Sequence, residues 1–193
     1  MRPIILASNS KARAELLRRC GFKFKVKASN IEELKCPRRQ GAKEIVIRNA
    51  LAKVRAVLPL FKTGVIIAAD TVVWQEKKVF GKPRDKKEAF RFIKELSLRP
   101  SYVYSGLAVA DINNNKIYAD SEVTKVWMVK LSDRQIKKYL SSAANQHINF
   151  AGGFDIQGKG SLFIERIDGC FYNVVGLPLA KLYKLLKKCN IDI

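Results

Sequence analysis

The sequence predicts an α/β or α+β domain built around a mixed β-sheet, and three observations support this. Segments with helical and with strand patterns alternate along the whole chain. Residues 102–111 and 116–129 have the pattern of two long strands joined by the turn residues 113–115, which makes part of the sheet antiparallel. The chain has 193 residues, of which 48% are hydrophobic, enough for one core and one domain, with room for two lobes.

Two strands and two helices are predicted in the first 60 residues. A buried strand over 2–7 leads into the helix-capping residues Ser8, Asn9 and Ser10, and a helix over 11–20 ends at Gly21. Residues 22–26 alternate like a strand, and 28–37 has no clear period, which favours a loop. An amphipathic helix over 41–58 ends before Pro59. Its predicted apolar side carries Ile45, Ile47, Ala50, Leu51, Val54 and Val57.

The rest of the chain continues this alternation. We expect a strand over 65–69, a bend at Asp70 and Thr71, a second strand over 72–74 and a turn over 75–78. A helix over 85–96 begins at Asp85, and Glu88 three residues later completes a capping-box pattern. After the hairpin, a short helix extends from Ser132 to about residue 140, a polar, glycine-rich segment follows, and residues 161–167 form a strand. The last helix follows Pro178.

The composition limits the classes of function. No apolar run approaches the roughly 18 residues of a membrane span, and the apolar N-terminal run is too short for a signal peptide, so we expect a cytoplasmic protein with no membrane partner. One histidine and four widely spaced cysteines exclude ordinary zinc spacing and leave little room for a Ser-His-Asp triad. The 37 basic and 17 acidic residues give a formal charge of +20, which attracts nucleic acid, anionic lipid or nucleotide phosphates. The basic residues are spread along the chain, so solvated helix faces explain most of them equally well.

Three acidic residues are candidates for catalysis or metal binding. Asp70 interrupts a run of residues typical of a buried strand, and a carboxylate there must be paired, bound to a metal or placed at a strand end. Glu32 and Glu33 lie in an irregular segment. Because Mg²⁺ takes one or two carboxylates together with substrate phosphate oxygens, these acids could form a metal site. Lys53 and Lys82 are candidate phosphate ligands, although either lysine alone also fits an ordinary surface position.

Two further segments could bind phosphate. The junction from Ser8 to Arg13 places hydroxyls, backbone N–H groups and the cations Lys11 and Arg13 at a helix start, although a simple capped helix explains it as well. Among the glycines of 152–160, Gln157 offers a donor and an acceptor suited to a base or a phosphate. Plain turns explain those glycines equally well.

Five motifs in order give a specific resemblance. They are "ILASNSKARAELL", "AADTVV", "FGKP", "AGGFDIQGKG" and "NVVGLP", and together they run nearly from end to end. The sequence resembles the Maf family, whose members are nucleoside triphosphate pyrophosphatases. The resemblance implies hydrolysis of a non-canonical or pyrimidine nucleoside triphosphate between its α- and β-phosphates with Mg²⁺ or Mn²⁺, in a house-cleaning role. It also implies a two-lobed α/β domain around a mixed twisted β-sheet with flanking helices, similar to the inosine triphosphatase fold, with a substrate cleft between the lobes and a homodimeric assembly.

The motifs also imply residue roles. Asp70 and Glu33 would bind the metal, and Asp70, Glu33, Lys53 and Lys82 would be catalytic. The residues expected to bind substrate are Ser8, Ser10, Lys11, Arg13, Thr71 and Gln157. The chain departs from the family pattern at Ala12, at Asn149-Phe150, at Asp155 and at Gly169-Cys170-Phe171. The combination of motifs resembles the branch acting on dTTP and UTP. The alternative is a basic nucleic-acid-binding or regulatory protein on an inactive scaffold of this kind.

Overall fold

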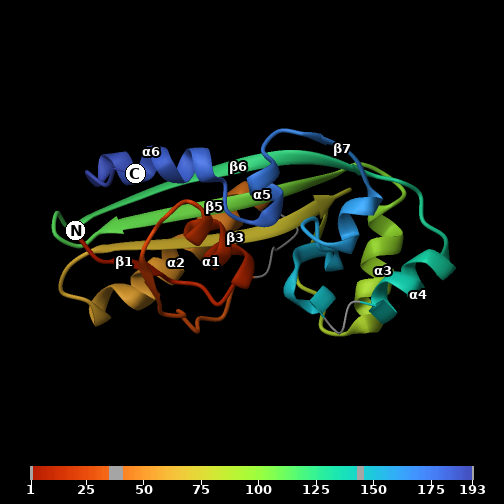
Figure 1. The fold of residues 1–193 in the computed structure, drawn as a ribbon, viewed down its shortest axis with the longest axis horizontal. Coiled ribbons are helices and arrows are strands. Elements are labelled where there is room, and N and C mark those ends of the chain that lie inside the picture. Colours follow the sequence, from red (N-terminus) through yellow and green to blue (C-terminus); the bar gives the residue numbers. More distant parts are fainter. Residues whose placement is uncertain (1, 35–40, 143–145, 193) are drawn as a thin grey trace. The chain divides into compact units, whose positions relative to one another are not determined.

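The computed structural model describes residues 2–34, 41–142 and 146–192, and it confirms a mixed α/β architecture (Figure 1). Seven strands form one sheet in the order β2-β1-β3-β5-β6-β7, with β4 paired to β3. The strands β1 and β2, and β1 and β3, are parallel, whereas the pairs β3–β4 and β6–β7 are antiparallel. The strands are β1 (Ile4–Leu6), β2 (Phe24–Val26), β3 (Val65–Gln75), β4 (Lys78–Phe80), β5 (Ser101–Asp111), β6 (Lys116–Met128) and β7 (Ile164–Asp168).

Helices lie between most of these strands along the chain, whereas β3 and β4, and β5 and β6, follow each other directly. The α-helices are α1 (Lys11–Arg19), α2 (Ala42–Val57), α3 (Lys86–Leu96), α4 (Asp133–Ser142), α5 (Phe171–Val175) and α6 (Leu179–Lys188). Short 3₁₀ helices are η1 (Leu58–Leu60), η2 (Gln146–Asn149), η3 (Ala151–Gly153) and η4 (Lys159–Phe163). None of the helices in the described ranges is long and apolar enough to cross a bilayer.

The chain divides into two compact units, each with its own core. The first comprises Met1–Asp70, Ser105–Glu122 and Gly176–Ile193, and the second comprises Thr71–Tyr104 and Val123–Val175. The second unit is therefore formed by two chain segments that are inserted into the first.

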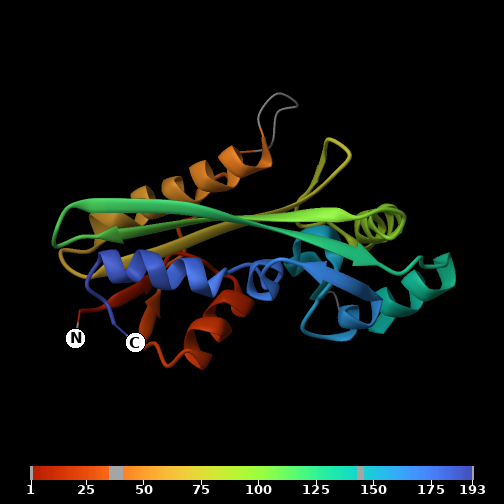
Figure 2. The ribbon, with the colours of Figure 1, turned by 90° about the horizontal axis from the view of Figure 1, so that it is seen from above.

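In the first unit, helices cover both faces of the sheet. Figure 2 shows α2 on one side of the strands and α1 and α6 on the other. Because side chains alternate along a strand, Ile66 and Ala68 of β3 point to the same face, where they pack in one core with Ala50 and Val54 of α2. Asp70 follows two residues after Ala68. The alternation therefore directs Asp70 toward α2.

In the second unit, α3 and α4 cover a strand face. Ile93 of α3 and Ile136 of α4 are fully buried in one core with Val73, Val103 and Val126 from three strands. The predicted cap of α3 is confirmed, since Asp85 accepts the backbone N–H of Glu88 at 2.7 Å. The Glu88 carboxylate does not accept the backbone N–H of Asp85, which a capping box requires. It accepts the backbone N–H of Arg84 at 2.8 Å instead.

The structure confirms the predicted helices over 11–20, 41–58 and 85–96 within one residue at each end, and it corrects three other details. The expected bend at Asp70 and Thr71 is wrong, because β3 continues through both residues. The predicted turn over 75–78 is confirmed at Glu76 and Lys77, which have positive φ angles of 46° and 66°, and β4 follows. The strand expected over 161–167 begins only at Ile164, since the preceding residues form η4.

The third correction concerns the inner side of α2. Val46 is buried in place of Ile47, which is only half-buried. Two polar residues, Asn49 and Lys53, are also buried on this side, one helical turn apart. Burying two polar side chains inside an apolar stripe requires polar partners there, and those partners identify the site.

Candidate functional site

Asp70 is the centre of a buried polar cluster in the first unit. Its side chain, carried by β3, is 5% exposed, and both of its oxygens have partners. Lys53 Nζ pairs with Oδ1 at 2.7 Å, and Asn49 Nδ2 donates to Oδ2 at 2.8 Å. Because Asn49 and Lys53 are four residues apart on α2, one helix face supplies both partners.

Lys53 joins Asp70 to a second carboxylate. Its ammonium group also pairs with Glu33 Oε1 at 2.7 Å and donates to the Ala69 carbonyl at 3.2 Å. Three partners use all three N–H groups of the ammonium. The Glu33 side chain is 54% exposed, whereas that of Lys53 is 8% exposed. The chain Asp70–Lys53–Glu33 therefore leads from a buried carboxylate to one that solvent and ligands can reach.

Asn49 belongs to this cluster but is not among the site residues that the sequence predicts. Besides its bond to Asp70, its Oδ1 accepts the backbone N–H of Leu34 at 2.9 Å, and its Nδ2 reaches the Leu34 carbonyl at 3.3 Å. The amide therefore anchors the loop that carries Glu33 to the helix that carries Lys53. The signal in the sequence was a polar residue one turn before Lys53 inside an apolar helical stripe.

Arg13 of α1 is the second buried cation. It donates from Nε to the Gly176 carbonyl at 2.8 Å, and from a terminal nitrogen to the Ala69 carbonyl at 2.8 Å and to Ser8 Oγ at 3.2 Å. Burial lowers the pKa of the Arg13 guanidinium, and the negative charges of Asp70 and Glu33 partly offset that shift. Arg13 and Lys53 share the Ala69 carbonyl, so both cations adjoin the strand residue before Asp70.

The predicted serines lie beside Arg13. Ser10 caps α1, with its Oγ accepting the backbone N–H of Arg13 at 3.4 Å. Ser8 Oγ accepts the backbone N–H of Ser10 at 3.2 Å as well as the Arg13 bond. Lys11 is exposed in the first turn of the helix. The structure thus brings together Ser8, Arg13, Lys53, Asp70 and Glu33 within one unit.

Three predicted residues belong to the second unit. Thr71 follows Asp70 directly in β3 and is half-buried, while Lys82 and Gln157 are exposed. The backbone N–H of Gln157 donates to Asp155 Oδ1 at 2.9 Å, a local turn that gives the departure at Asp155 a structural role. A contact of Lys82 or Gln157 with the Asp70 cluster stays a prediction, as does the cleft between lobes.

Asp70 and Glu33 suit a metal site in which the substrate supplies some of the ligands. Within the described ranges there is no group of three or more His, Cys, Asp or Glu side chains suited to hold a metal. Asp70 and Glu33 supply two hard carboxylate donors, joined through Lys53. Two carboxylates are too few for a cage made of protein alone, but they are the number that Mg²⁺ uses when phosphate oxygens and water fill its other positions.

Known proteins resemble this chain over most or all of its length. The family described as Maf-like protein matches residues 3–189. A dTTP/UTP pyrophosphatase of Methanosarcina barkeri is 41% identical over 194 residues, covering 100% of this chain and 97% of the relative. A dTTP/UTP pyrophosphatase of Clostridium botulinum is 40% identical over 196 residues, covering 100% of this chain and 100% of the relative. The Staphylococcus aureus Ham1 protein structure matches with a TM-score of 0.45 and 12% identity, over 66% of this chain and 72% of that one. The chain belongs to the Maf family.

Proposed function

We propose that this protein is a nucleoside triphosphate pyrophosphatase that hydrolyses dTTP and UTP to the monophosphate and pyrophosphate. The observation that carries the proposal is the buried Asp70 carboxylate, held by Lys53 and Asn49 and linked through Lys53 to the half-exposed Glu33. The relatives named dTTP/UTP pyrophosphatase support the substrate class. The family resemblance further supports a homodimer and a house-cleaning role.

The charges of the cluster favour a divalent metal as cofactor. Arg13 and Lys53 carry two positive charges, and Asp70 and Glu33 carry two negative charges, so the four side chains balance. A triphosphate brings several negative charges that this neutral set cannot offset. Asp70 and Glu33 would hold Mg²⁺ or Mn²⁺. The bound ion would neutralise phosphate charge and make a water molecule more acidic.

Besides the metal ion, individual residues of the protein have separate roles in the proposed reaction. Lys53 fixes the Asp70 carboxylate in one orientation through the bond at 2.7 Å, and Asn49 fixes its other oxygen. A carboxylate held in this way accepts the proton of the attacking water, for which Asp70 and Glu33 are the candidates. Ser8, Ser10, Lys11 and Arg13 bind phosphate oxygens near the start of α1. Thr71, Lys82 and Gln157 complete the substrate contacts.

The test compares Asp70→Asn with a matched variant, Asp120→Asn. Asp120 also pairs with a lysine, Lys181 at 3.1 Å, but this pair is half-exposed and outside the cluster. With dTTP and Mg²⁺ we expect the Asp70 variant to lose about 10²- to 10⁴-fold in kcat, the usual contribution of a proton-accepting group. The Asp120 variant should keep wild-type activity. Pyrophosphate and orthophosphate release are measured separately, and circular dichroism checks that both variants are folded.

Four outcomes would contradict the proposal. Full activity of Asp70→Asn would remove Asp70 from the reaction. Release of orthophosphate in place of pyrophosphate would move the cleavage to the outer anhydride. Activity that survives complete chelation of divalent ions would exclude the metal. Absence of turnover in the wild-type protein with all common triphosphates would favour the alternative, a regulatory protein on an inactive scaffold.

A further inference from the structure

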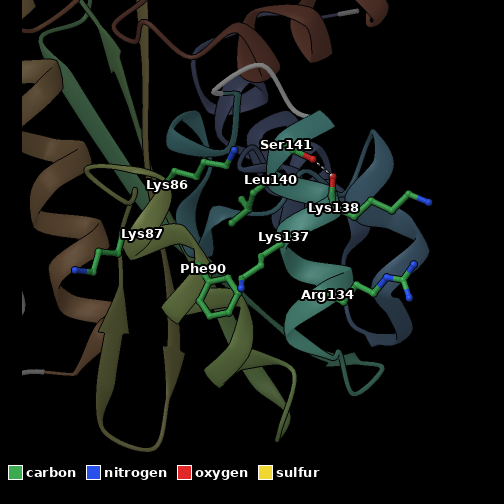
Figure 3. A pocket seen from close by; sticks show the side chains of 8 residues that line it. All are labelled: Lys86, Lys87, Phe90, Arg134, Lys137, Lys138, Leu140 and Ser141. Carbon is green, nitrogen blue, oxygen red and sulfur yellow. Dashed lines mark hydrogen bonds between the residues drawn. The ribbon is translucent and has the colours of Figure 1, made fainter.

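A cationic hollow lies on the second unit, between α3 and α4. Its cavity volume is about 780 Å³. Figure 3 shows the lining residues, which are Lys86, Lys87, Phe90, Arg134, Lys137, Lys138, Leu140 and Ser141. Five of the eight carry a positive charge and none is acidic. None of the eight belongs to the candidate active site.

The cations lie along a continuous face of α4. Arg134, Lys137, Lys138 and Ser141 have the spacing of neighbours on one side of a helix. The adjacent stripe of α4, with Ile136 and Tyr139, is buried in the core of the unit. The first turn of α3 adds Lys86 and Lys87. Two elements therefore present their cations to the same hollow.

Helix stability does not explain these positions. A cation is stabilised in the last turn of a helix and destabilised in the first. Lys86 and Lys87 are in the first turn of α3, Arg134 is in the first turn of α4, and no cation occupies the last turn of α4. Like charges three and four residues apart also repel. The arrangement thus costs helix stability unless an anion offsets the charge.

The acids nearby are engaged elsewhere. Glu88 accepts bonds from Arg84, and Asp133 pairs with Lys94 at 2.9 Å. Asp85 accepts the backbone N–H that caps α3. Among the described residues, none of the five cations of the hollow has an ion-pair partner. Their charge is therefore available to an external anion.

We propose that this hollow binds single-stranded nucleic acid, as a function separate from nucleotide hydrolysis. In Figure 3 the ammonium group of Lys87 points outward on one side and the cationic ends of Arg134 and Lys138 point outward on the other, whereas the ammonium groups of Lys86 and Lys137 lie between them. Cations spread in this way suit successive phosphates of an extended chain, whereas one phosphate needs donors that converge.

The apolar part of the hollow distinguishes a single strand from the other polyanions. The half-buried ring of Phe90 offers a surface on which an unpaired base can stack, and a duplex would keep its bases from that ring. Stable peripheral membrane binding adds projecting apolar side chains or a lipid anchor to the attraction of basic residues. Here Leu140 is 3% exposed and lies at the floor between the cations. The hollow therefore suits a single strand better than a duplex or a lipid surface.

The experiment measures binding of a fluorescein-labelled adenine oligonucleotide, about 20 nucleotides long so that it exceeds one binding site. Fluorescence anisotropy gives the affinity of the whole protein over a series of salt concentrations. For the triple variant R134A, K137A and K138A we expect at least about tenfold weaker binding at low salt. The slope of log affinity against log salt should become shallower by about 2, because each phosphate that is no longer neutralised removes about 0.7 from it.

Two further variants make the test specific. The triple variant K25A, K43A and K62A removes the same charge from exposed positions in the first unit and should bind nearly as the wild type does. Phe90→Leu should weaken binding about tenfold by loss of stacking, without changing the salt slope. Hydrolysis of dTTP should be unchanged in all three variants, and excess dTTP should not displace the oligonucleotide.

The proposal is overturned if both triple variants weaken binding equally, because net charge alone would then explain it. It is also overturned if the protein fails to bind the oligonucleotide but binds vesicles of phosphatidylserine and phosphatidylcholine, which would assign the hollow to a lipid surface. Displacement by dTTP would place the oligonucleotide in the nucleotide site instead. None of these outcomes depends on whether the proposed pyrophosphatase activity is present.

Discussion

The buried charge of Asp70 is tolerated inside the first unit because neighbouring groups pair with it. The ammonium of Lys53 and the amide of Asn49 each hold one oxygen, and no solvent is needed to satisfy either. Removing one member of such a buried pair typically costs about 3–5 kcal/mol, because the remaining charge is left without a partner. If the cluster is the active site proposed above, its variants change both stability and activity, and both must be measured.

Asn49 leads to a prediction about a single residue. It holds the backbone of Leu34, the residue after Glu33, so we expect Asn49 to act by positioning Glu33 and Asp70. Asn49→Leu should lower the free energy of unfolding by about 1–3 kcal/mol, because a buried carboxylate oxygen and a backbone N–H lose their partner. It should also lower kcat.

A double-mutant cycle with Glu33→Gln separates positioning from general destabilisation. If Asn49 acts through Glu33, the double variant should lose little more activity than Glu33→Gln alone. Activity losses that simply multiply would show that Asn49 acts independently of Glu33. The kinetic measurements are made below the unfolding transition of each variant, so that partial unfolding does not contribute.

At the scale of elements, the position of α2 decides where Lys53 and Asn49 lie. Gly106 of β5 allows the helix to approach, since a Cβ atom added there would overlap the backbone carbonyl of Val46 in α2. Asn49 and Lys53 are one and two turns further along the same helix. A strand glycine thus fixes the distance between the helix and the sheet that carries Asp70.

We therefore expect Gly106→Ala to displace α2. The overlap is with backbone, which cannot rotate away, and such overpacking typically costs about 1–3 kcal/mol. Urea denaturation should show this loss, and kcat for dTTP should fall as well because Lys53 and Asn49 move with the helix. The control is Gly41→Ala, where an added Cβ meets nothing within 4 Å. An unchanged kcat in a destabilised Gly106 variant would show that the helix position does not govern the site.

Across the whole molecule, patterns of local origin were predictable and long-range contacts were not. Capping by Ser10 and Asp85 could be identified because each depends on residues three positions apart. Asp70, Glu33 and Lys53 could be named as candidates, but no local pattern pairs Lys53 with Asp70, 17 positions away, or with Glu33, 20 positions away. The bend expected at Asp70 was wrong because the strand tolerates a carboxylate once α2 supplies its partners.

The net charge of +20 leads to a prediction for the molecule as a whole. Charges of one sign repel within a compact chain, and salt screens that repulsion. We expect the melting temperature to rise as sodium chloride is increased to about 0.15 M, where the screening length is about 8 Å. A gain of 1 kcal/mol corresponds to roughly 2–4 °C for a chain of this size. The variant R134A, K137A and K138A should respond less to salt, because three clustered cations are gone. A melting temperature that falls with added salt would mean that exposed ion pairs such as Lys94–Asp133 outweigh the repulsion.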